Sequence, residues 1–349
     1  MKIAILLTGL LFLFAGCNAQ PNAPEESKTA AEINLPEYID PPENDNNTEE
    51  CSELTEYTTV ITLPENTPPP HRESGIMEIY VFGLANADAI LITTENYVVM
   101  IDTGENQHGR QIVSHLINEN ICHIDYLIIT HFDRDHVGGA HTLVRYLDVR
   151  NIIVPNYGKE SRHVERLEIA MANAGLEAVV LTETLRFTLD EAEFVIYPSG
   201  LEFFFFYDID DDEGGATDAP RENDFSIVVS VAHGENNFLF TGDAMAVRLE
   251  ELLEIDEIID TDFDFLKAPH HGRHNRRSVQ FINAISPRYS VITCCEERPA
   301  DERVVTALED VGAEVYFSKH GDVHVRCDGH YIVVTQIGHD TNMYVYNRE

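Results

Sequence analysis

The sequence predicts an α/β protein whose helices pack on the outside of its β-sheets, and two observations support this class. From residue 77 to residue 181, short apolar runs alternate with longer segments of helical periodicity. This alternation is typical of domains in which helices cover the faces of sheets. The chain also repeats one order of features, namely a β-hairpin ending in an aspartate, then a helix, then a strand ending in histidines. The repeat indicates an internal two-fold arrangement.

The first half of this pattern begins with residues 77–82, where side chains alternate as they do in a strand. Glu95 and Asn96 separate two apolar runs and mark the turn of a hairpin. Residues 107–118 have the amphipathic periodicity of a helix. The strands that we expect here are residues 77–82, 89–92, 97–101, 126–129, 151–154 and 178–181, and the helices are residues 107–118, 140–147 and 159–174.

The second half begins with strands in residues 188–197 and then becomes irregular in residues 201–223. The irregular part contains an acidic stretch, Asp208–Glu213, that we interpret as a surface insertion, with a flap over the functional site as the alternative. A turn at residues 233–237 joins the second hairpin. The remaining strands that we expect are residues 225–232, 238–240, 263–268, 289–293, 315–317, 323–327 and 331–336, and the helices are residues 246–253, 278–284 and 302–311.

The charge of the chain restricts its partners. It has 349 residues, of which 61 are acidic and 23 basic, and its formal net charge is -38. Such a chain as a whole repels polyanions. Broad nucleic-acid binding is therefore disfavoured unless a local basic patch overcomes the repulsion.

The N-terminus predicts export. Lys2 precedes an apolar run at residues 3–15, which is too short to span a membrane and is typical of a secretory signal. The run ends in Phe14-Ala15-Gly16-Cys17, a pattern that resembles a bacterial lipobox with Cys17 as the lipid-modified residue. We expect a mature protein that is extracytoplasmic and anchored by lipid, without a transmembrane helix. If the lipobox is not used, ordinary cleavage would release it.

Composition divides the chain into three parts. Residues 1–17 are the predicted lipoprotein signal peptide, and residues 18–73 are rich in Pro, Asn, Glu and Thr and predict a disordered acidic tether. Residues 74–349 form the predicted globular domain. No two cysteines have CxxC spacing, so a zinc site made only of cysteines is not expected.

A dense group of potential metal ligands directly follows the apolar run at residues 126–129. The group comprises His131, Asp133, Asp135 and His136. Alternate residues of an extended segment point the same way, so we expect the first three to converge. His136 would then point elsewhere and suit a second metal. A polar loop with incidental acids is a poor account of such spacing after a core strand.

Three more strand ends carry polar residues. Asp102 follows residues 97–101, Asp243 follows the second hairpin, and His270 and His271 follow residues 263–268. Sites in α/β sheets lie at the carboxyl ends of strands. With the group after residue 130, these side chains can hold two metals, with Asp243 bridging. Imidazole and carboxylate ligands suit borderline or hard divalent ions.

At these residues the chain resembles the metallo-β-lactamase fold superfamily. The resemblance rests on Asp102-Thr103-Gly104, the group that starts at His131, Thr241-Gly242-Asp243 and the late histidine, in that order. Residues 88–92 and 266–272, together with the motif His131-x-Asp133-x-Asp135-His136, are similar to the extracytoplasmic domain of ComEC-type competence proteins. The resemblance implies an αββα sandwich of two mixed sheets and a centre of two divalent metal ions, with Zn²⁺ expected and Mn²⁺ as the alternative. It also implies nuclease action on DNA.

The resemblance assigns roles to individual residues. It implies one metal held by His131, Asp133 and Asp243. It implies a second metal held by Asp135, His136, Asp243 and one of His270 and His271, the other histidine being a candidate proton donor. Asp102 would orient ligands. The candidate catalytic residues are Asp135, His270 and His271.

Two features depart from the wider superfamily. Asp133 stands where its motif has a second histidine, and residues 221–226 lack the histidine that usually precedes the strand leading to Asp243. We reject His233 as a replacement, because it lies at the far end of the hairpin. Both changes move the site toward oxygen ligands and leave full occupancy of the first metal position open.

Arginines bear on the substrate. Arg134 stands between two predicted ligands, and Arg273, Arg276 and Arg277 form the densest positive cluster of the chain. Arginine binds phosphate oxygens in a fork, which favours a phosphodiester substrate, including DNA. Another ester, such as cell-wall phosphorylcholine, or a lactone or lactam, is the alternative substrate. A non-catalytic surface lipoprotein is the alternative without enzymatic activity.

Overall fold

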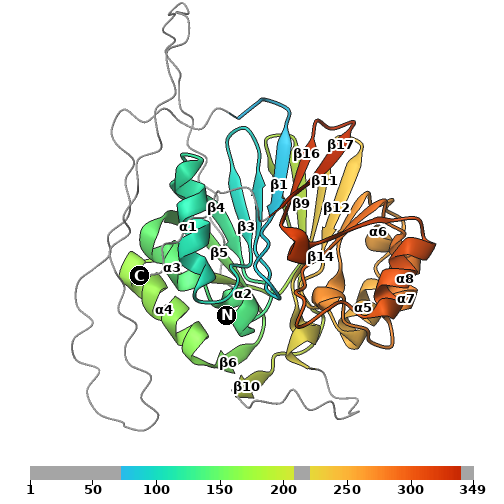
Figure 1. Cartoon of the computed structure of the whole chain (residues 1–349). Helices are drawn as coiled ribbons and strands as arrows, with labels where there is room; N and C mark the ends of the chain where they lie inside the picture. The colour runs from blue at the N-terminus through green and yellow to red at the C-terminus, as the bar shows by residue number, and fades with distance from the viewer. Residues whose placement is uncertain (1–71, 208–220, 339–349) are drawn as a thin grey trace, which may run out of the picture. The chain divides into compact units, whose positions relative to one another are not determined.

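A computed structural model describes residues 72–207 and 221–338, all within one compact unit (Figure 1). The predicted signal peptide with Cys17, nearly all of the tether, and the acidic stretch Asp208–Glu213 lie outside the described residues. Within the described ranges, no helix has the length and apolar character needed to cross a membrane.

Two large sheets form the centre of the fold. The eight-stranded sheet has the order β17-β16-β1-β2-β3-β4-β5-β7. Its strands are β1 (Met77–Val81), β2 (Ile90–Thr93), β3 (Val98–Ile101), β4 (His123–Ile128), β5 (Asp148–Pro155), β7 (Ala178–Leu181), β16 (Asp322–Cys327) and β17 (Ile332–Ile337).

The seven-stranded sheet has the order β15-β14-β13-β12-β11-β9-β8. Its strands are β8 (Leu185–Leu189), β9 (Ala192–Tyr197), β11 (Val228–His233), β12 (Asn236–Phe240), β13 (Phe265–Lys267), β14 (Tyr289–Ile292) and β15 (Glu314–Phe317). Both sheets contain parallel and antiparallel pairs.

Helices cover the outer faces of both sheets (Figure 1). Beside the first sheet lie α1 (His108–Asn118), α3 (Ala140–Tyr146) and α4 (Arg162–Ala174), and beside the second lie α5 (Ala246–Leu252), α6 (Asp256–Ile259), α7 (Ser278–Ile285) and α8 (Glu302–Asp310). The predicted αββα sandwich is confirmed.

Alternation along the strands explains the layers. In β12, Phe238 and Phe240 join the core shared by the two sheets, whereas Leu239 between them packs in the core under the helices. Phe265 and Leu266 of β13 divide in the same way. Successive side chains of a strand point to opposite faces, so a sheet covered on both faces needs apolar residues at nearly every position.

The predicted two-fold arrangement is present in the topology. In the first sheet, β2 and β3 are antiparallel and β4 then joins β3 in parallel. In the second sheet, β11 and β12 are antiparallel and β13 joins β12 in parallel. Each sheet therefore brings the carboxyl ends of two neighbouring strands to one edge.

The structure corrects three expectations. The segment after Asp133 is not extended, because residues Arg134–Val137 form the short helix α2. The helix expected at residues 159–174 begins at Arg162, since Gly158–Glu160 form strand β6 and Ser161 caps the helix by accepting a hydrogen bond from Val164 N. Part of the irregular region, Phe205–Tyr207, is strand β10, which pairs in parallel with β6.

Candidate metal centre

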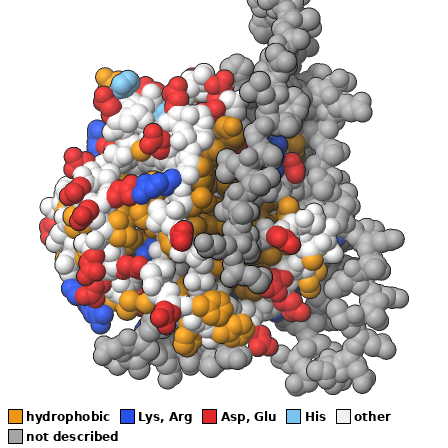
Figure 2. Space-filling model, turned by 180° about the vertical axis from the view of Figure 1, so that it is seen from behind, with side chains coloured by type: hydrophobic (Ala, Val, Ile, Leu, Met, Phe, Trp, Pro, Cys, Tyr) orange, Lys and Arg blue, Asp and Glu red, His pale blue; other side chains and the backbone are white. Residues whose placement is uncertain are grey.

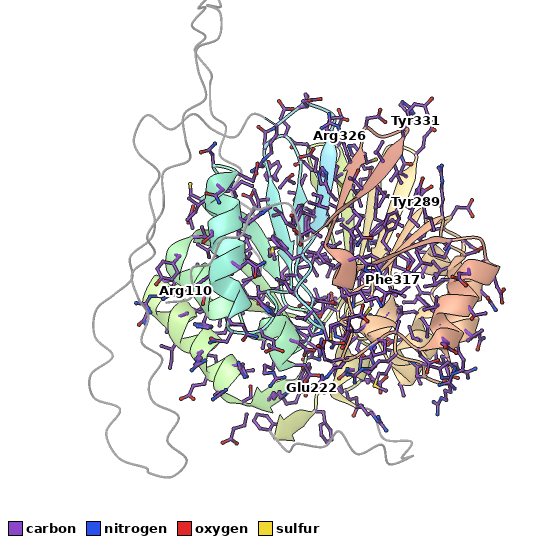
Figure 3. All side chains as sticks on the ribbon, in the orientation of Figure 1. Arg110, Glu222, Tyr289, Phe317, Arg326 and Tyr331 are labelled. Carbon is purple, nitrogen blue, oxygen red and sulfur yellow. The ribbon has the colours of Figure 1, made fainter. Side chains whose placement is uncertain are left out.

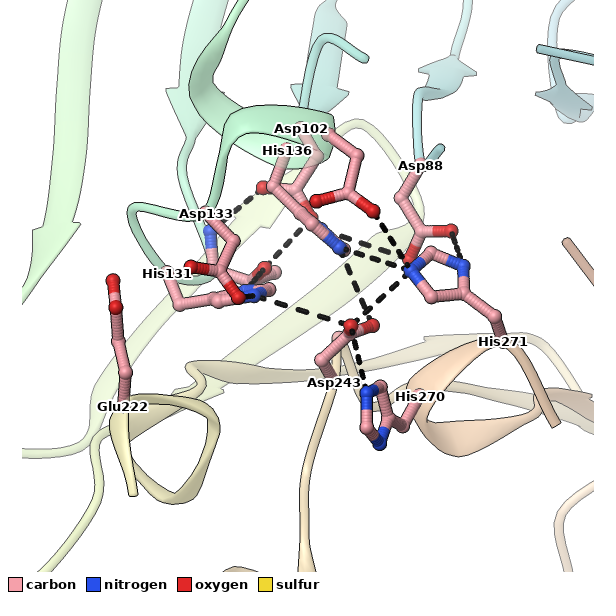
Figure 4. Close-up of polar contacts among 12 residues, drawn as sticks. Asp88, Asp102, His131, Asp133, His136, Glu222, Asp243, His270 and His271 are labelled. Atoms are coloured by element: carbon pink, nitrogen blue, oxygen red, sulfur yellow. Dashed lines mark hydrogen bonds and ion pairs between the residues drawn. The ribbon is translucent and has the colours of Figure 1, made fainter. Parts of the chain in front are cut away.

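The carboxyl ends of β3, β4, β12 and β13 bring the predicted residues together between the two sheets (Figure 4). Each polar side chain follows an apolar strand, and the strand is held in register by its neighbours. The residues that meet there are Asp102, His131, Asp133, Asp135, His136, Asp243, His270 and His271.

Asp102 orients the imidazole of His136. Oδ2 of Asp102 lies 2.8 Å from Nδ1 of His136, and a carboxylate only accepts, so Nδ1 donates. Asp102 also accepts hydrogen bonds from the backbone N (2.8 Å) and the hydroxyl (2.7 Å) of Thr130. Nε2 of His136 is thereby directed at Oδ1 of Asp243, 3.3 Å away.

His271 is held in an equivalent way from the second sheet. Its Nδ1 lies 3.0 Å from the carbonyl oxygen of Thr293, to which it donates. Its Nε2 then lies 3.1 Å from Oδ2 of Asp243, 3.4 Å from Nε2 of His136 and 3.5 Å from Oδ2 of Asp135. Four potential ligands therefore converge, and two of them come from each sheet.

His131 and Asp243 carry atoms that lack hydrogen bonds. Nδ1 of His131 lies 3.1 Å from the hydroxyl of Thr130. That hydroxyl already donates to Asp102, so Nδ1 of His131 donates to it. Nε2 of His131 and Oδ1 of Asp243 are buried without a hydrogen-bond partner among the described residues. Buried polar atoms are costly unless satisfied, and a divalent ion bound at Asp243 would satisfy Oδ1.

Charge pairing shifts the pKa values of the centre. Burial would lower the pKa of His271, but Asp243 and Asp88 raise it to about 9. The pKa of His136 is also well above its usual value, because Asp243 and Asp102 outweigh the effect of burial. Burial would raise the pKa of Asp243, yet His271 and His136 hold it well below its usual value. Without a metal, protonated imidazoles neutralise the buried carboxylate.

His270 differs from its neighbour. Its Nε2 lies 3.8 Å from Oδ2 of Asp243, and its side chain is 14% exposed, compared with 1% for His271. Burial lowers the pKa of His270 to about 4. The imidazole is therefore neutral at pH 7. The geometry favours His271 as the metal ligand of the pair and leaves His270 at the solvent side.

A family model described as the metallo-beta-lactamase superfamily matches residues 83–295. The chain belongs to this superfamily. ComE operon protein 3 of Bacillus subtilis is 26% identical over 212 residues, which cover 56% of this chain and 25% of that protein. Recombination protein 2 of Haemophilus influenzae is 26% identical over 213 residues, which cover 59% of this chain and 22% of that protein. The predicted resemblance to ComEC-type proteins is confirmed.

The matched segment spans about a quarter of the length of these two relatives. Among solved structures, the metallo-beta-lactamase fold protein YhfI from Bacillus subtilis is similar, with a TM-score of 0.45 and 12% sequence identity. The match covers 70% of this chain and 98% of that one. The metallo-β-lactamase fold implies binding of divalent metal, and the His/Asp clusters of the centre are the candidate ligands.

Asp133, which stands in place of a superfamily histidine, faces two ways. Its Oδ2 lies 3.4 Å from Nε2 of His131, and its Oδ1 lies 2.9 Å from Nζ of Lys159. Lys159 comes from β6 and also contacts Glu222, which begins the short 3-10 helix η1 (Glu222–Phe225). Asp133 as a metal ligand stays a prediction.

The extended-segment argument was wrong for His136. Because α2 turns the backbone, His136 points toward Asp243, as His131 does. The potential ligands form overlapping clusters, one with His131, His136 and Asp243 and another with Asp135, His136 and His271. His136 therefore belongs to both clusters, whereas the sequence argument assigned it to a second metal alone.

Sequence reasoning did not assign a role to Asp88 or Lys267. Both are fully buried, and they form an ion pair with each other. Lys267 also donates to the carbonyl oxygen of Gly242 (3.0 Å) and lies 3.6 Å from Oδ1 of Asp243. Asp88 precedes β2, and β2 is antiparallel to β3, so the start of one and the end of the other share an edge. The predicted hairpin therefore already indicated that Asp88 lies close to Asp102.

The predicted substrate arginines separate into two groups. Arg134 is 57% exposed beside the centre and lies 3.6 Å from Glu105, and Arg273 is near enough to His270 to affect its pKa. Arg276 and Arg277 instead contact Glu250 of α5. Substrate binding by all four stays a prediction, and the geometry favours Arg134 and Arg273.

His233 lies apart from the centre, as expected. It ends β11, and its Nδ1 is 3.3 Å from the sulfur of Cys327. This position agrees with our expectation that His233 is not a metal ligand.

We predict that His271→Ala lowers zinc affinity far more than His270→Ala does. Loss of a metal ligand should lower zinc affinity by more than the roughly 10–100-fold that loss of an orienting partner causes. The zinc affinity of His270→Ala should stay near that of wild type. Calorimetric titration of the metal-free variants with Zn²⁺ measures this, and circular dichroism checks that both fold. A larger loss in His270→Ala would reverse the assignment.

We also predict that metal affinity rises with pH up to about 9. Below the pKa of about 9, His271 carries a proton that the metal must displace. Each displaced proton should raise the apparent affinity about tenfold per pH unit until the imidazole is neutral. Titrations from pH 7 to pH 10, in buffers of different ionisation enthalpy, measure the affinity and the proton release. Affinity that is flat between pH 7 and pH 9 would contradict the prediction.

Proposed function

We propose that the chain is an exported, lipid-anchored metallo-hydrolase that cleaves phosphodiesters, with DNA as its candidate substrate. The observation that carries the proposal is the buried group of imidazoles and carboxylates at the carboxyl edge of both sheets, in a metallo-β-lactamase domain. Such a group offers the imidazole and carboxylate donors that suit a divalent ion. The sequence match to a protein named Recombination protein 2 supports a substrate related to DNA.

The roles of the residues follow from their contacts. Asp135, His136, Asp243 and His271 would hold metal, since their donor atoms face one another. A bound divalent ion lowers the pKa of water and polarises a phosphoryl oxygen. His270, neutral at pH 7 and partly exposed, can take up a proton and return it to the leaving group.

The donor set bears on metal identity. Two imidazoles and two carboxylates suit zinc, and the share of oxygen donors admits manganese. We propose zinc as the resident ion, with manganese as the alternative that metal analysis of the purified protein would distinguish.

Local positive charge is needed for a polyanionic substrate. Figure 2 shows acidic side chains spread over one face with few basic ones among them, in keeping with the net charge of -38. Arg134 and Arg273 are the arginines beside the centre, and a guanidinium matches the geometry of phosphate. These two residues support a phosphodiester over a lactone or lactam.

We predict that Asp243→Ala abolishes hydrolysis of bis-p-nitrophenyl phosphate and of single-stranded DNA while the fold persists. The variant removes the carboxylate that faces four imidazoles, and Lys267 keeps Asp88 as its partner. Rates at saturating Zn²⁺ or Mn²⁺ and thermal unfolding are the measurements. Asp256→Ala, at an exposed position that begins α6, is the matched control.

Other outcomes decide between substrates. Metal-loaded wild type that cleaves a phosphorylcholine ester, a lactone or a lactam but neither phosphodiester would refute the proposed substrate class. A folded wild type that binds no metal would favour the non-catalytic lipoprotein. Retained turnover in Asp243→Ala would refute the role of that carboxylate.

We predict that Cys17→Ala moves the protein from the membrane fraction to the soluble exported fraction. The lipid on this cysteine is the proposed anchor, and buried acyl chains supply the membrane affinity. Fractionation of cells and labelling with a fatty acid measure this, with Cys51→Ala as the control. Membrane association that survives Cys17→Ala would contradict the anchor.

A further inference from the structure

Lysine is rare in this chain and is concentrated at the metal centre. The sequence has five lysines, and two of the three in the described ranges, Lys159 and Lys267, contact carboxylates of the centre. Lys267 is fully buried against Asp88. Lys159 instead contacts Asp133, which stands where the superfamily motif has a second histidine, and Glu222, which lies in the segment that lacks a histidine.

Lys159 is held in place from three directions. Its Nζ lies 2.9 Å from Oδ1 of Asp133 and 2.9 Å from Oε2 of Glu222, and its side chain is only 10% exposed. Its backbone belongs to β6, which pairs with β10. Glu222 is in turn fixed by the hydroxyl of Tyr157, which donates to Oε1 at 2.7 Å. Figure 4 shows Glu222 on the same side of the centre as Asp133 and His131.

The ammonium of Lys159 already lies between the two carboxylates at this position. Asp133 and Glu222 contribute two negative charges, and Lys159 compensates one of them at hydrogen-bond distance. A dication beside His131 and Asp133 would be placed next to a fixed positive charge in a partly desolvated site, where repulsion is strong. One oxygen of Asp133 is also already used by the ammonium.

The other half of the centre has a complete donor set. Asp135, His136, Asp243 and His271 face one another with separations of 3.1 to 3.5 Å between the measured donor pairs. Lys267 approaches Oδ1 of Asp243 at 3.6 Å, but its closest partner is Asp88, and Oδ2 of Asp243 faces His271. This half can therefore bind an ion with four protein ligands.

We propose that the ammonium of Lys159 takes the place of one of the two metal ions, so that the centre binds a single divalent ion tightly, through Asp135, His136, Asp243 and His271. Asp133 and Glu222 then serve as partners of the lysine and not as metal ligands. Lys159 is a positioning residue that keeps a positive charge beside Asp133. The inference concerns the metal centre alone and does not depend on the substrate class.

Metal stoichiometry tests this without substrate. The purified full chain is saturated with Zn²⁺, desalted and analysed for zinc per chain, and parallel samples loaded with Mn²⁺ are examined by electron paramagnetic resonance. We expect one ion per chain and an uncoupled Mn²⁺ spectrum for wild type. Lys159→Met, which removes the charge at similar length, should bind two ions and give an exchange-coupled spectrum.

Two variants serve as controls. Lys159→Arg keeps the positive charge and should stay at one ion per chain. Lys319→Met removes the charge of the remaining lysine in the described ranges, which pairs with Glu296 at 3.2 Å, and should also stay at one. Wild type with two tightly bound, coupled ions would overturn the proposal, even if Lys159→Met does not fold. A folded Lys159→Met that stays at one ion would likewise overturn it.

Discussion

The buried carboxylate of Asp243 is the group on which the arrangement of the centre depends. It is 3% exposed and faces Nε2 of His131, His136 and His271. A buried charge is costly unless it is paired and hydrogen-bonded, and removal of one partner leaves the rest uncompensated. The buried carboxylate also raises the pKa values of His136 and His271, because it stabilises their protonated forms. The same protons that stabilise the metal-free centre must leave when a metal binds.

The two similar halves of the fold bring the partners of Asp243 together from both sheets. One sheet contributes Asp102, Asp135 and His136, and the other contributes Asp243 and His271. Each histidine is oriented by an acceptor on its own sheet, Asp102 for His136 and Thr293 for His271. Figure 3 shows that Glu222 lies at the end of the molecule opposite to Arg326 and Tyr331, so the additional acidic partner belongs to the edge that carries the centre.

Much of this could be predicted from the sequence because strand ends are local features. The apolar runs before Asp102, His131 and Asp243 correspond to β3, β4 and β12 within a few residues. The prediction was wrong where backbone direction changed within the motif, since α2 turns His136 toward Asp243. Asp88 and Lys267 were not assigned because their roles depend on a pair between residues far apart in the chain. The arginines after His271 could not be ranked either, since Glu250 of another helix contacts two of them.

The sequence by itself determined the α/β class, the order of strand-end ligands and the superfamily, because hydrophobic periodicity and ligand spacing are written along the chain. The tertiary structure decided which of His270 and His271 faces Asp135 and Asp243, and which carboxylates meet a lysine. Those choices depend on atoms brought by other elements, such as the carbonyl of Thr293 and the ammonium of Lys159. Residue spacing cannot supply them, because the direction of a buried polar side chain follows from the partner that satisfies it.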